Sequence, residues 1–208
     1  MVKKTSVLAV MAVCLMSACS SEKSETSNAD AATEAADYVT PVSRKYDVKS
    51  GVIHFETSGL GMSGKKIVYF DDYGSKERVE TYDEAGNMDI YNFSDGKTRY
   101  WVNLSDKTVH IADQNGSLGW EMKFPEWSEV DGRDGFKKLP NMEVAGKDCA
   151  AMQYGDNNVF AGWKGLTLYH GQKPNLEIKA VKLELDKAVD PALFKTPDGY
   201  EVKEGSYF

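Results

Sequence analysis

The chain lacks a hydrophobic run long enough to span a membrane as a helix, which requires about 20 apolar residues. Its best candidate, Val7–Met16, is uncharged and mostly apolar but too short. Two lysines precede this run, and two small residues, Ser17 and Ala18, follow it. This order of charged, apolar and small residues is typical of a secretory signal. We therefore expect residues 1–18 to be removed on export.

The signal ends at Cys19, one of only three cysteines in the sequence. The stretch Leu15–Cys19 (LMSAC) resembles the lipobox of bacterial lipoproteins, with Met16 where Leu is commonest. The resemblance implies a diacylated Cys19 as the new N-terminus, and two acyl chains suffice for a stable membrane anchor. The alternative is an ordinary cleaved signal that releases a soluble protein.

The shortage of cysteine also excludes a stabilising disulfide. With Cys14 discarded and Cys19 lipidated, Cys149 has no intramolecular partner. The fold must then be held by packing. We expect Cys149 to be a small buried apolar residue rather than a reactive thiol.

Basic side chains are also fewer than acidic ones. The 25 basic and 32 acidic side chains give a formal net charge of −7, and loss of the two lysines in the signal lowers it to −9. This charge argues against binding to nucleic acid, which requires a basic patch. It argues equally against electrostatic attachment to anionic lipid.

Large apolar residues are missing from the segment after the lipobox. Residues 20–36 contain no aromatic or large aliphatic side chain, so this segment cannot bury enough surface to fold. We expect a flexible tether over residues 19–37 and one folded domain over residues 38–208.

Motifs for catalysis or for binding metals and cofactors are absent or fail on context. No G-x-S-x-G nucleophile motif occurs. His54, His110 and His170 lie in three separate predicted strands, without ligand spacing for a metal. Gly59–Lys66 matches G-x-G-x-x-G and nearly a P-loop, but both motifs need a following helix, and Ile67–Gly74 has the composition of a strand. We expect a hairpin connection there, no metal, no cofactor and no enzymatic activity.

Short aromatic and β-branched runs separated by turn residues dominate from residue 48 onward, which is typical of strands. The alternation is clearest in Thr98–Leu104, where Tyr100, Val102 and Leu104 alternate with Arg99, Trp101 and Asn103. The predicted strands are Val52–Thr57, Ile67–Phe70, Lys76–Tyr82, Met88–Phe93, Thr98–Leu104, Lys107–Ala112, Lys147–Tyr154, Asn158–Trp163, Leu166–His170 and Leu176–Leu185.

A glycine- and proline-containing segment, Asn115–Pro140, interrupts this pattern. We expect short helical turns at Pro125–Val130 and Asp134–Leu139 that cover the sheet. The sequence also predicts a helical turn at Asp190–Phe194, with Asp190 as its N-cap. The sequence as a whole predicts a mainly β (α+β) fold, a strongly curved antiparallel sheet or half-barrel with a few short helices covering it.

Four stretches together resemble a family of uncharacterised bacterial lipoproteins: Tyr69–Gly74, Ala145–Cys149, Trp163–Leu166 and Phe194–Tyr200. This family is similar in layout to the Lol-type carriers that sort lipoproteins to the outer membrane. The resemblance implies an antiparallel half-barrel closed by helices around a hydrophobic cavity. No functional motif of the Lol carriers can be matched, so lipoprotein transport is not implied.

Aromatic residues exceed what the turns of a small sheet need. They are consistent with ordinary core packing or with the lining of a concave apolar pocket. The candidate ligand-lining residues are Trp101, Trp120, Phe124, Trp127, Phe160 and Trp163.

These features favour a membrane-anchored, non-enzymatic lipoprotein that binds a hydrophobic or lipid ligand. Ser20, rather than Asp, follows Cys19, which favours the outer membrane facing the periplasm. The alternative is a structural or interaction module that binds an envelope protein partner.

Overall fold

The computed structural model describes residues 44–59, 63–112 and 123–204. The expected signal, the lipidation site Cys19 and the tether lie outside these residues. No helix in the described part of the chain is both long and apolar enough to cross a membrane.

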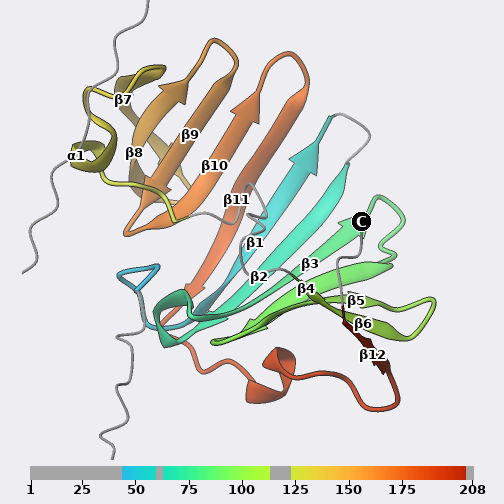
Figure 1. Ribbon diagram of the computed structural model, residues 1–208. Coiled ribbons are helices and arrows are strands. Elements are labelled where there is room, and N and C mark those ends of the chain that lie inside the picture. The colour runs from blue at the N-terminus through green and yellow to red at the C-terminus, as the bar shows by residue number, and fades with distance from the viewer. Residues whose placement is uncertain (1–43, 60–62, 113–122, 205–208) are drawn as a thin grey trace, which may run out of the picture. The chain divides into compact units, whose positions relative to one another are not determined.

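Within these described residues, twelve strands form one sheet in the spatial order β12-β6-β5-β4-β3-β2-β1-β11-β10-β9-β8-β7 (Figure 1). The same residues include three short helical elements. The elements are β1 (Gly51–Ser58), β2 (Gly64–Asp71), η1 (Asp72–Gly74), β3 (Lys76–Asp83), β4 (Ile90–Asp95), β5 (Arg99–Asn103), β6 (Thr108–Ala112), α1 (Trp127–Val130), β7 (Phe136–Val144), β8 (Lys147–Tyr154), β9 (Asn158–Trp163), β10 (Leu166–Gln172), β11 (Leu176–Leu185), η2 (Pro191–Phe194) and β12 (Glu201–Lys203).

The sheet consists of two antiparallel meanders, β1 to β6 and β7 to β11. They are joined where β1 pairs with β11, from Gly51 opposite Leu185 to Ser58 opposite Glu177. Strand β12 returns to lie parallel to β6 and is the exception to the antiparallel pattern. The outer strands β7 and β12 end the sheet without closing it. The predicted mainly β fold with a curved, unclosed sheet is therefore confirmed.

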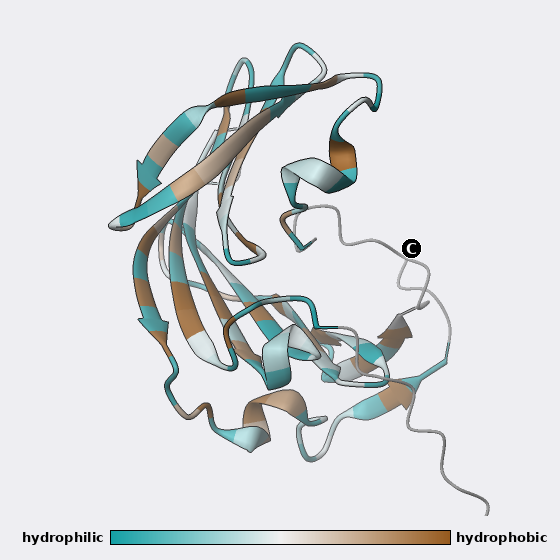
Figure 2. Cartoon of the chain, turned by 90° about the vertical axis from the view of Figure 1, so that its left-hand side faces the viewer, coloured by the Kyte–Doolittle hydropathy of each residue, from teal (hydrophilic) through white to brown (hydrophobic). Residues whose placement is uncertain are grey.

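Irregular pairing interrupts the sheet in the half that contains β7 to β11. Register shifts occur between β1 and β11 at His54/Phe55, between β9 and β10 at Thr167/Tyr169, and between β7 and β8 at Leu139/Met142. A bulge bends its strand and increases the local twist. The three shifts are thus consistent with the strong curvature of the sheet visible in Figure 2.

The part of the largest apolar cluster that β1 to β3 contribute lies on the concave face of the sheet. Ile53 on β1, Val68 on β2 and Val79 on β3 are opposite one another in the register and nearly fully buried. On β4 to β6 the buried side chains project from the other, convex face, where Phe93 and Val102 belong to a second cluster. The helical turn η2 packs against β3 and β4 on this convex side. The apolar core therefore changes face between β3 and β4.

Residues 44–50, which we call the N-terminal strap, join turns of the two meanders. The backbone N–H groups of Lys45 and Tyr46 donate to the carbonyl of Tyr73, each at 3.0 Å. The N–H of Asp47 donates to the carbonyl of Lys164, also at 3.0 Å. The strap therefore connects the β2–β3 turn to the β9–β10 turn.

Most of the predicted elements are present. The ten predicted strands correspond to β1–β6 and β8–β11, with bounds that differ by up to three residues. The segment Gly59–Lys66 precedes β2 rather than a helix, and β1 pairs with β2 as an antiparallel hairpin. The turn at Asp190–Phe194 is η2, and Asp190 accepts a hydrogen bond from the N–H of Ala192 at 2.9 Å. The turn within Pro125–Val130 is α1.

The predicted helical turn at Asp134–Leu139 is wrong, because β7 begins at Phe136. Proline is tolerated only on edge strands or at bulges, and Pro140 lies at both, since β7 ends the sheet and its register shifts between Leu139 and Met142. Proline and glycine are local signals of loops and helix ends, so the sequence around Pro140 does not indicate a strand. The short strand β12 was also not predicted.

Replacement of Gly165 should reveal how closely the strap lies on the sheet. A Cβ at Gly165 would lie 2.7 Å from the carbonyl oxygen of Lys45, and its φ is +77°. The matched control is Gly146→Ala, in the equivalent position of the β7–β8 turn, where φ is +73° and no atom lies within 4 Å of the Cβ. We expect Gly146→Ala to cost about 1 kcal/mol for the left-handed backbone alone. Gly165→Ala should cost about 1–3 kcal/mol more.

Urea unfolding of the two variants measures this difference. Equal losses would contradict the contact between the strap and the β9–β10 turn.

Candidate binding site on the concave face

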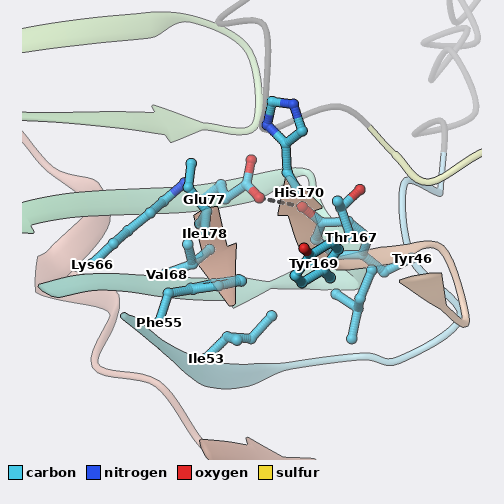
Figure 3. Close-up of a pocket in the computed structure, with 11 residues that line it drawn as sticks. Tyr46, Ile53, Phe55, Lys66, Val68, Glu77, Thr167, Tyr169, His170 and Ile178 are labelled. Carbon is cyan, nitrogen blue, oxygen red and sulfur yellow. Dashed lines mark hydrogen bonds between the residues drawn. The ribbon is translucent and has the colours of Figure 1, made fainter. Parts of the chain in front are cut away.

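A small cavity of about 30 Å³ opens on the concave face, where the strap meets the sheet (Figure 3). Its walls are apolar side chains of β1, β2, β10 and β11, together with Tyr46 of the strap. Four polar residues also line it, Lys66, Glu77, Thr167 and His170. A cavity of this size has room for one or two water molecules or for a single small functional group.

Glu77 fastens the strap to β3. Its carboxylate forms an ion pair with the ammonium group of Lys45 and accepts a hydrogen bond from the hydroxyl of Tyr46, which Figure 3 marks with a dashed line. Glu77 is only 8% exposed. A buried carboxylate requires such partners, because its transfer from water is otherwise very costly. The same two contacts therefore satisfy Glu77 and hold the strap in place.

Lys66 lies on β2, opposite Phe55 of β1, and is only 3% exposed. Its Nζ is 5.5 Å from the centre of the Phe55 ring, a distance that allows a cation–π interaction. Lys66 and Lys45 thus place two ammonium groups in the neighbourhood of the single carboxylate of Glu77. The site is polar beneath an otherwise apolar face.

His170 presents a hydrogen-bond acceptor to this region. Its ring stacks on Phe160 with 4.4 Å between centroids, and its Nε2 lies 3.3 Å from Oδ1 of Asn158. An amide oxygen only accepts, so Nε2 carries the proton and donates, and Nδ1 is the acceptor of the neutral ring. Among the described residues Nδ1 is buried and has no partner. Burial, and secondarily the charge of Lys66, lower the pKa of His170, which keeps the ring neutral.

Three of the six predicted lining residues gather around α1. Phe124, Trp127 and Phe160 belong to one cluster with Val130 and Met152. Figure 2 shows α1 inside the curve of the sheet, so this cluster covers the concave face. The approach is close: a Cβ at position 162 of β9 would lie 2.1 Å from the Phe124 ring, which only glycine permits.

The other three residues are elsewhere. Trp163 packs against the main core at the end of β9, with Nζ of Lys147 and of Lys164 each 4.8 Å from the centre of a Trp163 ring. Trp101 on β5 is opposite Asn92 and His110, far along the sheet from α1, with β4, β3, β2, β1, β11 and β10 between it and β9. Trp120 lies outside the described residues. Whether any of the six lines a bound ligand stays a prediction.

The cavity residues Lys66, Glu77 and Thr167 were not predicted from the sequence. A signal for Lys66 does exist, because it alternates with Val68 and Phe70 and so occupies a core-facing position of β2. Glu77 has the same relation to Val79 on β3. A charged residue in such a register indicates a buried charge with partners from elsewhere in the chain.

The other titratable groups occupy separate places. Among the described residues, no group of three His, Cys, Asp or Glu side chains is arranged to hold a metal ion. His54 lies 3.1 Å from Glu184, whose pKa is lowered to about 2, chiefly by Lys187 and then by Lys182 and His54. Cys149 is fully buried, as predicted, and burial raises the pKa of its thiol.

A buried carboxylate also organises the convex face. Glu80 accepts hydrogen bonds from Nε of Arg78 at 2.8 Å and from the hydroxyl of Tyr82 at 2.7 Å. The guanidinium of Arg78 lies 3.6 Å from the ring centre of Tyr91, and so bridges the network to the second apolar cluster. Burial, and then the hydrogen bond to Glu80, raise the pKa of Tyr82 to about 12.

Comparison with known proteins finds likeness in structure alone. No protein-family model and no curated protein sequence matches the chain. An uncharacterised conserved protein from Thermus thermophilus aligns with a TM-score of 0.49 and 11% identity, over 74% of this chain and 90% of that one. MucB aligns with a TM-score of 0.49 and 15% identity, over 76% of this chain and 62% of that one. MucB in complex with MucA(peri) aligns with a TM-score of 0.50 and 15% identity, over 78% and 58%.

The chain thus spans about three fifths of the length of the MucB chains. At this identity the likeness concerns the fold. It fits loosely the half-barrel implied by the resemblance to lipoprotein carriers.

Removal of the Glu77 charge should weaken the fold. We expect Glu77→Gln to lower the free energy of unfolding by about 2–4 kcal/mol, because the partly buried ammonium of Lys45 loses its carboxylate. Adding Lys45→Met should recover part of this loss, since it removes the unpaired charge. The control Glu56→Gln, at an exposed position of β1, should stay within about 0.5 kcal/mol of the parent. A neutral effect of Glu77→Gln would mean that the ion pair does not form in solution.

Tyr82 should make the fold sensitive to alkaline pH. Folding raises the pKa of Tyr82 from the unfolded value of 10 to about 12. The stabilisation that this shift gives is fully present below pH 10 and is lost as pH rises toward 12. The free energy of unfolding should therefore fall between these values, and fall less steeply in Tyr82→Phe. Denaturant unfolding across this pH range measures the slope, with Tyr154→Phe as the exposed control. Identical slopes in Tyr82→Phe and the parent would contradict the partly buried hydrogen bond to Glu80.

Proposed function

We propose that this chain is a non-enzymatic binding module of the bacterial envelope, and that a segment of a partner protein binds on its concave face. The single observation that carries the proposal is the small cavity beneath that face, whose apolar walls also include polar residues. The expected export signal and the lipid anchor at Cys19 support a location in the envelope, and Ser20 supports the outer membrane.

The size of the cavity favours a protein partner over an engulfed lipid. Pockets for small molecules typically measure about 300–1,000 Å³, whereas this cavity measures about 30 Å³. The strap fills part of the concave face with Tyr46 and Val48, and the segment that leads into α1 covers another part with Phe124. An acyl chain would have to displace these elements, whereas a peptide can lie across them.

The chemistry of the cavity points the same way. Nδ1 of His170 is a buried acceptor without a partner among the described residues. A peptide group carries an N–H donor that can match this acceptor. A hydrocarbon chain has no donor and would leave Nδ1 without a partner.

The edges of the sheet make a less suitable docking surface. Strand β7 carries two exposed lysines, Lys137 and Lys138, together with Pro140 and a register shift. These are the features by which edge strands avoid pairing with other chains. Strand β12 is only three residues long and fully exposed. The complex of MucB with MucA(peri) adds support, since a chain of similar fold is solved with a protein partner.

The second candidate is a hydrophobic or lipid ligand. The α1 cluster favours it, because Phe124, Trp127 and Phe160 gather their rings at one place on the concave face. Opening of α1 would enlarge the space below.

Photo-crosslinking in cells distinguishes these candidates. A photoreactive phenylalanine analogue replaces either Trp127 on α1 or Trp101 on β5. Trp101 is opposite Asn92, which is opposite Val79, so Trp101 is on the same concave face as Val79. The control position is Val181, which is 46% exposed and alternates with buried Ala180. We expect both tryptophan positions to label the same protein, with no such adduct from Val181.

Adducts of lipid mass at Trp127 would instead favour the second candidate. Equal labelling from Val181, or no discrete adduct at any position, would overturn the proposal.

A further inference from the structure

A second and much larger cavity lies on the convex face, remote from the proposed partner site. It measures about 370 Å³ and lies between η2 and the adjoining ends of β2, β3, β4 and β5. This volume falls within the usual range for small-molecule pockets, about 300–1,000 Å³. The cavity is therefore large enough for a ligand of the size of an amino acid or a dipeptide.

Aromatic rings form the apolar wall of this cavity. Phe93 on β4 and Tyr100 on β5 stack with 4.6 Å between ring centroids, at an angle of 16°. Phe194 of η2 contributes a third ring. Phe93 and Phe194 are almost fully buried, so the rings are held rigidly by the fold. An apolar side chain of a ligand can be covered here without rearrangement.

Charged groups of both signs line the same cavity. Asp71 on β2 is directly opposite Lys76 on β3, and Lys76 is directly opposite Asp95 on β4. Lys195 follows η2 and adds a second ammonium group. Opposite charges facing each other across strands usually pair. Yet neither lysine forms an ion pair or a side-chain hydrogen bond with any residue that the structure describes.

The carboxylate of Asp95 forms hydrogen bonds within the fold, whereas that of Asp71 forms none with the part of the chain that the structure describes. Oδ1 of Asp95 accepts hydrogen bonds from the N–H groups of Lys97 and Thr98, both at 2.8 Å, and Oδ2 accepts one from Tyr100 at 3.2 Å. Asp71 precedes η1, but its side chain does not cap that turn. The groups available to a ligand are therefore one carboxylate and two ammonium groups beside an aromatic wall.

We propose that this cavity binds a small zwitterion with an apolar side chain, namely an amino acid or dipeptide with free termini. The ammonium group of the ligand pairs with Asp71, and its carboxylate pairs with Lys76 and Lys195. The side chain packs against Phe93, Tyr100 and Phe194. The two carboxylates and two lysines of the cavity cancel in charge, so a ligand of a single sign gains less than a zwitterion. The proposal is independent of the partner site on the concave face.

Isothermal titration of the purified full-length chain in mild detergent tests this. The probe is the dipeptide alanyl-phenylalanine, compared with its N-acetylated form and its C-terminal amide. We expect saturable binding of the free dipeptide. Blocking either terminus should weaken it at least about tenfold, because each block removes a charge-assisted hydrogen bond. Saturable binding of all three forms with equal affinity would reduce the site to an apolar groove and overturn the proposal, and so would no binding of any form.

Variants of the charged residues locate the binding. Lys195→Gln and Asp71→Asn should each weaken binding of the free dipeptide at least about tenfold. Both positions are at least partly exposed, so the fold should persist, which the thermal unfolding temperature verifies. The matched control Lys65→Gln removes the same charge from an exposed position at the opposite end of β2. An equal loss in Lys65→Gln, or none in Lys195→Gln, would show that the ligand binds elsewhere and would overturn the proposal.

Discussion

The pairing of β1 with β11 is the constraint on which the rest of the structure depends. Each meander forms by local hairpins, but this one ladder joins residues as distant as Gly51 and Leu185 into a single sheet. Closing so long a loop costs chain entropy that only extensive burial can offset. The two strands supply it, since Ile53 and Phe55 of β1 and Ala180 of β11 are almost completely buried. On their outer side Glu184 binds His54, Lys182 and Lys187 and so reinforces the same joint.

The joined sheet is strongly curved (Figure 2), and its concave face must be filled. The strap and α1 fill it, and each depends on glycine for its close approach. A Cβ at Gly74 would lie 2.5 Å from the Tyr46 ring, and one at Gly165 would meet the strap backbone. Gly162 gives the same freedom to Phe124. These contacts occupy part of the concave face, and the cavity that opens beside the strap is small, about 30 Å³.

The strands were predictable because alternation and turn residues are local signals. Strand β7 was missed because Pro140 and nearby glycines suggested loop or helix, and only the sheet order reveals that this strand is an edge. The β1–β11 joint has no local signal at all. Of the predicted site, Phe124, Trp127 and Phe160 do gather, because α1 places them together. Lys66 and Glu77 were overlooked because their burial depends on partners distant in sequence.

Two buried polar groups of the concave face differ in what they contribute to the fold. Apolar residues of similar volume in place of a buried ion pair are often neutral or stabilising. The burial of Glu77 is explained by the structure, since Glu77 holds Lys45 and Tyr46 of the strap. The burial of Nδ1 of His170 has no such explanation, because this acceptor has no partner among the described residues and its burial opposes folding. Local features that cost stability concentrate at functional sites. A group that donates to Nδ1 from outside the fold would remove this cost on binding, which is why the concave face, rather than a sheet edge, is the stronger candidate for the partner site.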